Sequence, residues 1–514
     1  MATVKSISYA LNSRAFRRGS QTLRGSHEII PIEPVHVGHK RQLLMDRYVV
    51  DDLNGCHRTV HQPVKHPDNP IISAEQPYEG AGPNSWGTIL REPETGLFRI
   101  WTSVHDLSMF RRDGKVPAVK RVHYYESDDG LSWRRPELGL CEYAGSKTNN
   151  IIMNNCLADY VYVLPLPKRM HDRGHYGMLY CNALANDQIP DPENMHHMRS
   201  FVAFSDDGIH WNDAPENPVW CGRTDTNNCI VYNAERDVFM MYRRATINAG
   251  EIRRIAYSES KDLISWTQPI NIFGHDELDP IGLYGMAVSS YEGIYWGFLM
   301  RLHYHPAFEE GKALVGGKDN TMDTELAWSR DSIHWERHPL RPAFIPTSAP
   351  YGESYDWGQV RGMANIIEID DEIRIYYAGH EYLHAPGILR DDDPKTTHIC
   401  LATLRRDGFV SIDSGPYGGY MLTKPVTYPG GKLHINARTK EDGFVRVAVR
   451  EGQGVRDGEW PEEWQFDHSA PFLGNNLDHI MAWQHGKSIE VFPSETLRLH
   501  FWMEKAELYS FWFE

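Results

Sequence analysis

Four stretches of the chain share the pattern Ser-x-Asp-x-x-x-Trp: Ser127-Asp-Asp-Gly-Leu-Ser-Trp133, Ser205-Asp-Asp-Gly-Ile-His-Trp211, Ser260-Lys-Asp-Leu-Ile-Ser-Trp266 and Ser329-Arg-Asp-Ser-Ile-His-Trp335. A fifth, degraded copy reads Arg405-Arg-Asp-Gly-Phe-Val-Ser411. Each copy follows a short apolar run, which is typical of a strand that enters a tight turn. The Asp side chain can accept hydrogen bonds from the turn amides, and the Trp ring can pack the turn against the sheet. We therefore interpret the motif as structural and the chain as a row of five similar units.

A β-hairpin is expected ahead of each motif, because two apolar runs flank a short turn-forming segment there. In the first unit, residues 86–90 and 98–103 flank the turn sequence Arg91-Glu-Pro-Glu-Thr-Gly96. Each unit then consists of four antiparallel strands, named A to D in chain order. Five such units around one axis make a five-bladed β-propeller. Alternating strand and helix patterns are missing from the sequence, which argues against a Rossmann fold or an α/β barrel.

The two ends of the chain are expected to differ from the repeats. Residues 418–514 alternate apolar and polar residues without the turn motif, which predicts a C-terminal antiparallel β-sandwich. Residues 1–40 predict a basic N-terminal arm, which favours a homo-oligomer. Residues 41–417 would form the propeller, with 41–60 supplying a strand that helps to close the ring. The predicted fold class is all-β, a five-bladed β-propeller followed by a β-sandwich.

Composition excludes several classes of function. The 53 Lys and Arg residues against 69 Asp and Glu residues give a formal net charge of −16. This balance argues against nucleic acid as a partner, since nucleic-acid binding needs a clustered positive field. No apolar run is long enough to span a membrane. The 7 cysteines form no Cys-x-x-Cys pair and there is no apolar signal core, so we expect reduced thiols and a cytoplasmic protein without a metal or cofactor.

Chain direction predicts where functional residues gather. In an antiparallel A-B-C-D unit, strand A begins and strand B ends at the same rim, whereas the repeated turn between C and D lies at the opposite rim. Residues before strand A and after strand B, among them His105 and Tyr284, should therefore surround one concave opening. These positions combine acids, bases and aromatic rings. This combination suits a sugar, since rings stack on its faces and polar groups bind its hydroxyls.

Four aspartates near the starts of the A strands are candidate catalytic residues, because two carboxylates that face a glycosidic bond can cleave it. Asp159 and Asp225 are preferred because they lie closest to the expected inner strands, whereas Asp279 and Asp356 stand in turn-like sequences. Cationic residues are in excess at this rim, which predicts an anionic group such as uronate or phosphate on the carbohydrate substrate. The candidate substrate-binding residues are Asn84, Trp86, Asn227, Arg243, Arg301, His303, Trp357, Arg361, His380 and Glu381.

The repeated motif and the acids at the A strands resemble those of the five-bladed propeller glycoside hydrolases, the superfamily of families 32, 43, 68, 117 and 130. The segment Gln42-Leu-Leu-Met-Asp46 and the segment at 61–70 look like those of bacterial family-32-like proteins. The resemblance implies the same fold and a glycosidase activity. Family 32 opens its first inner strand with an acidic motif, and Pro83-Asn-Ser-Trp-Gly87 stands there instead. The family's usual catalytic residues are therefore not carried over.

The sequence thus favours an exo-acting glycoside hydrolase with paired carboxylates at the rim. Three alternatives stay open: a glycoside phosphorylase, a glycan-binding propeller without catalysis, and a lyase that acts on a uronate-containing glycan. They differ in phosphate dependence, in turnover and in the unsaturated product of a lyase.

Overall fold

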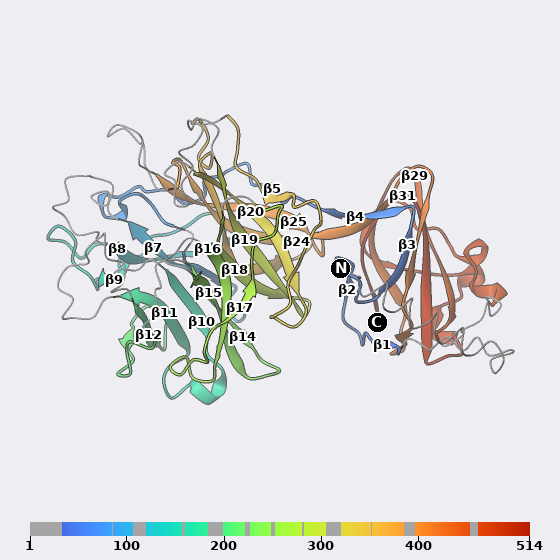
Figure 1. Ribbon diagram of the computed structural model, residues 1–514, viewed down its shortest axis with the longest axis horizontal. Helices are drawn as coiled ribbons and strands as arrows, with labels where there is room; N and C mark the ends of the chain where they lie inside the picture. Colours follow the sequence, from blue (N-terminus) through green and yellow to red (C-terminus); the bar gives the residue numbers. More distant parts are fainter. Residues whose placement is uncertain are drawn as a thin grey trace. The chain divides into compact units, whose positions relative to one another are not determined.

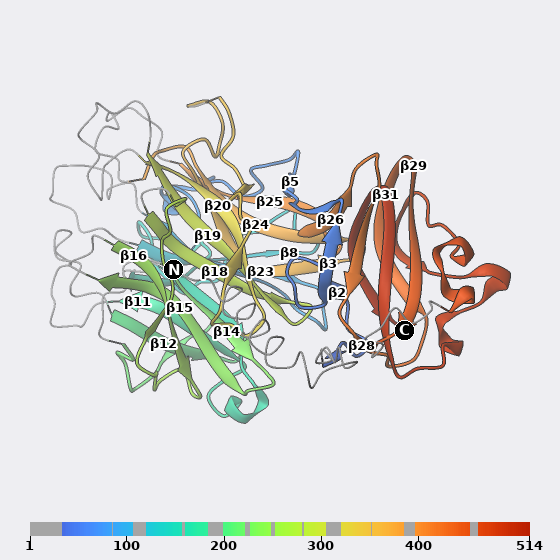
Figure 2. The same cartoon turned by 45° about the vertical axis from the view of Figure 1, so that its right-hand side comes forward.

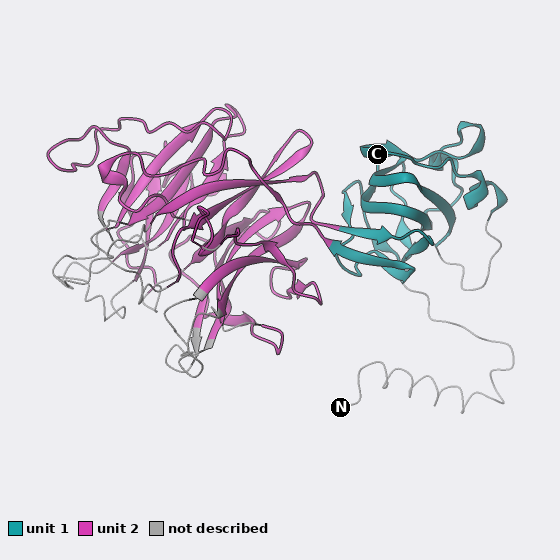
Figure 3. Cartoon of the chain, turned by 90° about the horizontal axis from the view of Figure 1, so that it is seen from above, with its two compact units in different colours: residues 1–59, 411–514 teal, residues 60–410 magenta. Residues whose placement is uncertain are grey.

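The computed structural model describes residues 33–84, 86–105, 120–156, 160–182, 199–220, 227–247, 252–279, 282–304, 320–350, 352–384, 396–452 and 461–514. Within these ranges the chain is all-β, and its helical segments are 3-10 turns of three residues. None of the described helices is long and apolar enough to cross a bilayer. The described chain divides into two compact units, residues 60–410 and residues 33–59 with 411–514 (Figure 3). The predicted N-terminal arm lies outside the described residues up to position 32.

Residues 60–410 contain five groups of antiparallel strands (Figure 1, Figure 2). Each group pairs its strands in chain order, as the repeats predict, except that the last strand of the fifth group comes from an earlier part of the chain. The groups are β6 (Thr88–Arg91), β7 (Phe98–His105), β8 (Lys120–Ser127) and β9 (Ile151–Cys156); β10 (Val161–Pro165), β11 (Tyr176–Asn182), β12 (Arg199–Ser205) and β13 (Asn212–Asp213); β14 (Asn228–Asn233), β15 (Val238–Ile247), β16 (Ile252–Ser260) and β17 (Ile270–Phe273); β18 (Gly282–Tyr291), β19 (Ile294–Tyr304) and β20 (Asn320–Ser329) with β21 (Glu336–Arg337) and β22 (Ala343–Ile345); and β23 (Gln359–Ile369), β24 (Glu372–His380), β25 (Thr397–Arg405) and β5 (Val64–Lys65).

The first strands of the five groups contact one another in a cycle. β6 contacts β10, β10 contacts β14, β14 contacts β18, β18 contacts β23, and β23 returns to β6. One parallel pairing between first strands reinforces the cycle, at Ala364 of β23 with Thr88 of β6. A second parallel pairing, at Met322 of β20 with Gln359 of β23, joins the fourth group to the fifth. Apolar side chains such as Ile89, Val163 and Met286 are buried on these strands. The starts of the five first strands therefore neighbour one another.

The repeated motif forms the turn after the third strand of a group. In the first copy, Asp129 Oδ1 accepts hydrogen bonds from the backbone amides of Leu131 and Ser132, both at 2.7 Å. Burial raises the pKa of Asp129, but these amides outweigh it and bring the pKa to about 2. In the other copies, the Trp donates its Nε1–H to a carbonyl of the same turn, as Trp211 does to Gly208 at 3.1 Å. In the four full copies the Asp carboxylate is thus used within the turn, as is the Trp Nε1–H in three of them, whereas Trp133 Nε1 is buried without a described partner.

The N-terminal segment pairs with the C-terminal segment rather than with the repeats. The expectation that residues 41–60 close the ring is therefore wrong, and β5 pairs with β25 in that place. The physical reason is burial, because Leu44, Val49 and Val50 belong to the apolar core of the second unit. The strands of that ten-stranded sheet are β1 (Val35–His36), β2 (Gln42–Leu43), β3 (Val50–Asn54), β4 (Cys56–Val60), β26 (Val410–Ser414), β27 (Gly419–Thr423), β28 (Val426–Thr427), β29 (Leu433–Glu451), β30 (Asn475–Ile480) and β31 (Thr496–Phe513).

Short 3-10 turns lie between the strands of both units. Glu79, in the first of them, is fully buried and accepts hydrogen bonds from the Tyr125 hydroxyl and from Arg135. The turns are η1 (Pro77–Glu79), η3 (Lys168–Met170), η5 (Glu462–Trp464), η6 (Phe466–His468), η7 (Gln484–Gly486) and η8 (Ile489–Val491).

A substitution at the turn position that follows the motif's Asp can test whether the repeat has a structural role. Gly208 has φ +76°, and a Cβ there would lie 2.6 Å from Arg99 Nη2 and 2.9 Å from Trp101 Cζ2. Gly208→Ala should lower the free energy of unfolding by about 2 kcal/mol or more, because a left-handed Ala costs about 1 kcal/mol and the clash adds to it. Urea denaturation measures the change. Ser332→Gly is the matched control, since Ser332 occupies the equivalent position with φ +74°. That variant should not be destabilised, and equal losses in both variants would contradict the analysis.

Candidate functional site

Two of the predicted catalytic residues, Asp159 and Asp225, lie outside the described residues. The remaining candidates are described, and they fall into separate groups. One group lies where the five first strands neighbour one another. The others are tied into ion pairs and hydrogen bonds.

Each of the five strand groups contributes one residue to a set of central side chains. Trp86 precedes β6, Tyr162 lies on β10, Asn227 precedes β14, Tyr284 lies on β18, and Arg361 lies on β23. The rings of Trp86 and Tyr284 stack with their centroids 6.1 Å apart. The Arg361 guanidinium carbon lies 4.9 Å from the centre of the Trp86 ring and 5.4 Å from that of Tyr284. Three predicted residues, Trp86, Asn227 and Arg361, are thus found in this set.

Asn227 joins the set through its neighbours on two strands. The Tyr162 hydroxyl donates a hydrogen bond to Asn227 Oδ1. On the other side, Gly285 of β18 lies so close that a Cβ there would be 3.1 Å from the Cβ of Asn227. Asn227 thus lies against Gly285, the residue after Tyr284, and its Nδ2 atom is buried without a hydrogen-bond partner among the described residues.

Three histidines lie near Arg361. His105 ends β7, His380 ends β24, and His384 packs edge-on against Tyr284 with the centroids 4.7 Å apart. Burial lowers the pKa of all three, and the positive charge of Arg361 lowers each of them further. The three imidazoles are therefore neutral at neutral pH. We call Trp86, Tyr284, Arg361 and these three histidines the central cluster.

Arg243, another candidate, stacks on an aromatic ring. Its guanidinium carbon lies 4.3 Å from the centre of the Trp220 ring. Burial lowers the pKa of Arg243 to about 10, so the group keeps its charge at neutral pH. The contact is a cation–π stack of a buried guanidinium on a half-buried ring.

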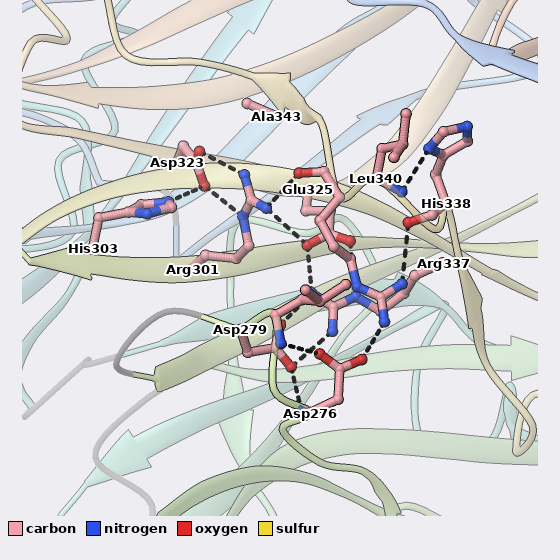
Figure 4. A network of polar contacts seen from close by, with 12 residues as sticks. Asp276, Asp279, Arg301, His303, Asp323, Glu325, Arg337, His338, Leu340 and Ala343 are labelled. Atoms are coloured by element: carbon pink, nitrogen blue, oxygen red, sulfur yellow. Dashed lines mark hydrogen bonds and ion pairs between the residues drawn. The ribbon is translucent and has the colours of Figure 1, made fainter.

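Arg301, His303 and Asp279 form a separate ion-pair network (Figure 4). Arg301 donates to Asp323 with both Nε (2.8 Å) and Nη2 (2.7 Å), and His303 Nε2 lies 2.8 Å from the same carboxylate. Burial raises the pKa of Asp323. The interactions with His303 and Arg301 lower the pKa by more than burial raises it, so the net shift is downward. The Arg301 guanidinium also donates to Glu325 at 3.1 Å. These contacts use the polar atoms within the network.

The candidate acid Asp279 belongs to the same network. It is almost fully buried, and both of its carboxylate oxygens accept hydrogen bonds from Arg337, which also donates to Glu325 (Figure 4). A carboxylate held by a bidentate guanidinium is fixed in place. This geometry gives Asp279 a structural task.

Asp356 is likewise paired. The carboxylate is completely buried, 2.6 Å from Lys65 Nζ, and accepts further hydrogen bonds from Ser354 and Tyr377. Lys65 belongs to β5, so the pair fastens that strand to the fifth group. The neighbouring Trp357 is half-buried in the same turn.

Glu381 and Asn84 complete the list of candidates. The Glu381 carboxylate accepts a hydrogen bond from Thr396 and lies 3.3 Å from His398 Nε2, which lowers its pKa. Asn84 is buried, and its carbonyl accepts a hydrogen bond from the Thr102 hydroxyl.

Sequence reasoning missed His384 and Arg253, which face Tyr284. The guanidinium carbon of Arg253 lies 4.9 Å from the centre of the Tyr284 ring. Arg253 lies on β16, a third strand, and the rim argument considered only first and second strands. His384 follows His380 by four residues beyond strand β24, so a wider window after strand B would have found it.

The described residues offer no group of three His, Cys, Asp or Glu side chains arranged to hold a metal ion. What they offer is a cluster of aromatic rings, neutral imidazoles and guanidiniums. Such a cluster can stack on a ring, donate hydrogen bonds to hydroxyls and hold an anion.

Comparison with known proteins gives neighbours at the level of structure. No protein-family model matches the sequence, and no curated protein matches it. Among solved structures, the chain is similar to an N-acetylgalactosamine deacetylase from F. plautii in complex with blood group B trisaccharide, at 15% identity and a TM-score of 0.43, covering 70% of this chain and 96% of that one.

Two further neighbours are glycoside hydrolases. A glycosyl hydrolase from Bacteroides ovatus is 14% identical with a TM-score of 0.40, covering 71% of this chain and 96% of that one. A GH32 β-fructofuranosidase from Bombyx mori is 10% identical with a TM-score of 0.38, covering 90% of this chain and 94% of that one. The neighbours thus include glycoside hydrolases, one of them of family GH32, at low identity.

The ion-pair network predicts a strong effect of Arg337 on stability. Arg337→Gln leaves Asp279 and Glu325 buried without their shared cation, which should cost about 3–5 kcal/mol of unfolding free energy. Urea denaturation at neutral pH measures the loss. Arg134→Gln is the control, since Arg134 pairs with Asp128 on the exposed first turn and should matter little. A loss no larger in Arg337→Gln than in Arg134→Gln would contradict the structural task of the network.

Proposed function

We propose that this chain is a glycoside hydrolase that cleaves a terminal glycosidic bond of an oligosaccharide or glycoside. In this proposal the five strand groups are the blades of a propeller and the second unit is a β-sandwich. The cyclic contacts of the first strands support the arrangement. The substrate would bind at the axis, where the first strands begin.

One observation carries the proposal: all five strand groups supply a side chain to the same small region. Two of these side chains are stacked rings, and Asn227 and Arg361 add hydrogen-bond donors. Rings bind the apolar face of a sugar, and convergent donors bind its hydroxyls. A central site built from every repeat is the arrangement that an axial substrate pocket requires.

The catalytic carboxylates in this proposal are Asp159 and Asp225. Asp279 and Asp356 are held by Arg337 and Lys65, so they are less suited to proton transfer. Asp159 directly precedes the segment that enters β10, and Asp225 stands two residues before Asn227. One carboxyl group would protonate the leaving oxygen, while the other would activate water or attack the sugar.

The proposal is tested with Asp159→Asn and Asp225→Asn on a panel of aryl glycosides and oligosaccharides. Each variant should lose about 10²–10⁴-fold in kcat, because general acid–base catalysis contributes that much, with an unchanged unfolding midpoint. Asp279→Asn and Asp356→Asn are the comparison variants, which should lose stability. Full turnover of a cleaved substrate by Asp225→Asn would remove that residue from the mechanism.

A glycan-binding propeller without catalysis is the second candidate. The observation that favours it is the pairing of Asp279 and Asp356, the two candidate acids that are described. Saturable glycan binding with no bond cleavage across the panel would support it. Cleavage that requires inorganic phosphate would identify a phosphorylase instead. The homo-oligomer and the cytoplasmic location stay predictions from the sequence.

A further inference from the structure

Arg361 is a buried cation without a carboxylate partner among the described residues. Its side chain is 5% exposed, and its one described hydrogen bond runs from Nη2 to the neutral amide of Gln359 at 2.5 Å. The Nε–H is buried without a partner. An unpaired buried charge costs several kcal/mol, so a chain retains one where it serves a ligand or a specific arrangement. Arg301 and Arg337, by contrast, have three carboxylate partners between them, which are Asp323, Glu325 and Asp279.

Further unpartnered polar atoms surround Arg361. Trp86 Nε1, His105 Nε2 and both ring nitrogens of His380 are buried and have no hydrogen-bond partner within the described part of the chain. Buried polar groups are nearly always hydrogen-bonded, so each of these atoms calls for a partner that the described chain does not supply. They occur together in the central cluster. A ligand in this place would satisfy several of them at once.

The surroundings of the cluster are also positive. Lys120 lies close enough to His105 to lower its pKa, and Arg244 and Arg253 act in the same way on His384. The described charges that act on the three histidines are therefore cationic, apart from the imidazoles themselves. Such a concentration of positive charge attracts an anion.

We propose that Arg361, with Trp86, His105 and His380, binds the carboxylate and adjoining hydroxyls of a sugar acid, so that the substrate carries a uronate. The inference rests on the proposed function in one respect, that the ligand is a carbohydrate. A guanidinium binds a carboxylate through its planar edge. The contacts of Arg361 with Trp86 and Tyr284 hold that edge in position, and the same rings can lie against the sugar to which the carboxylate is attached.

Charge favours a carboxylate over a phosphate. The three histidines are neutral, so they offer single donors and acceptors that match hydroxyl groups. A phosphate carries nearly two negative charges and three acceptor oxygens, and it is matched best by several charged donors. Of the buried atoms named above that lack a described partner, those of Arg361 carry the one permanent charge, which equals the charge of one carboxylate.

The first experiment uses the wild-type chain and compares ligands by calorimetry. The ligands are D-glucuronate, D-galacturonate, the neutral methyl esters of both, D-glucose, glucose 6-phosphate and inorganic phosphate. At least one uronate should bind about 10- to 100-fold more tightly than its methyl ester, since a charge-assisted hydrogen bond is lost in the ester. Added salt should weaken binding of the uronate and leave binding of the ester unchanged.

The second experiment compares Arg361→Met, Arg361→Lys and the exposed control Arg134→Gln. Arg361→Met should abolish the preference for the uronate over its ester, Arg361→Lys should retain part of it, and the control should retain all of it. Without ligand, Arg361→Met should unfold at the same or a higher urea concentration, because an unpaired buried charge is removed. A merely structural arginine would give the opposite shift, with loss of stability and no change in ligand preference.

The outcomes separate this inference from the proposed function. If neutral glycosides are cleaved, and the uronates bind no better than their esters or less well than glucose 6-phosphate, the carboxylate site is wrong and the hydrolase proposal stands. If a uronate binds through Arg361 and no glycoside is cleaved, the inference stands and the hydrolase proposal fails. If no ligand of the series binds the wild-type chain, the inference is overturned.

Discussion

The pairing of β5 with β25 is the constraint on which residues 60–410 depend. Through it, a strand that precedes the first group completes the fifth group. Lys65 of this strand reaches the buried carboxylate of Asp356, and Asn69 bonds both backbone polar groups of Leu401. Arg361 of the fifth group lies against Trp86 of the first, where β23 pairs with β6. The central cluster therefore joins residues that are far apart in the sequence.

Buried charged side chains occur in two kinds of surroundings within residues 60–410. In the network of Arg301 and Arg337, each guanidinium meets carboxylates on neighbouring strands, so the desolvation cost of each ion is offset by its partner. In the central cluster the described neighbours of Arg361 are rings, an amide and neutral imidazoles. The first arrangement stabilises the fold. The second leaves Arg361 without a carboxylate partner among the described residues, which is the basis for the proposed anion site.

The sequence predicted strands and turns well because both are local. The Ser-x-Asp-x-x-x-Trp copies specify their turns through contacts within four residues, such as Asp129 with Ser132. The pairing of strands is not local. The expectation that residues 41–60 pair with the repeats is wrong for this reason, since they pair with the C-terminal strands. Their apolar pattern indicates a buried strand but not the sheet in which it is buried. Leu44 and Val50 pack with residues beyond 411, a choice that only the completed core decides.

The difference between local and long-range contacts also limits prediction of the site. Chain direction predicts which residues lie near the starts of the first strands, and Trp86, Asn227 and Arg361 lie there. Their role in binding stays a prediction. Whether an acid is free or paired depends on a partner far along the chain, as with Asp279 and Arg337 or Asp356 and Lys65. No spacing in the sequence reveals these pairs, because each side chain meets its partner only after the strands of its own group have assembled.

The charges of the central cluster also indicate which of the two proposed carboxyl groups would act as base or nucleophile and which as general acid. A carboxylate close to Arg361 is favoured in its ionised form, since a nearby cation lowers its pKa. Such a group suits a nucleophile or a base. A general acid must keep its proton near neutral pH, which requires burial away from positive charge. In the proposed mechanism, the carboxyl group nearer to Arg361 is therefore the base or nucleophile, and the acid is the one farther away.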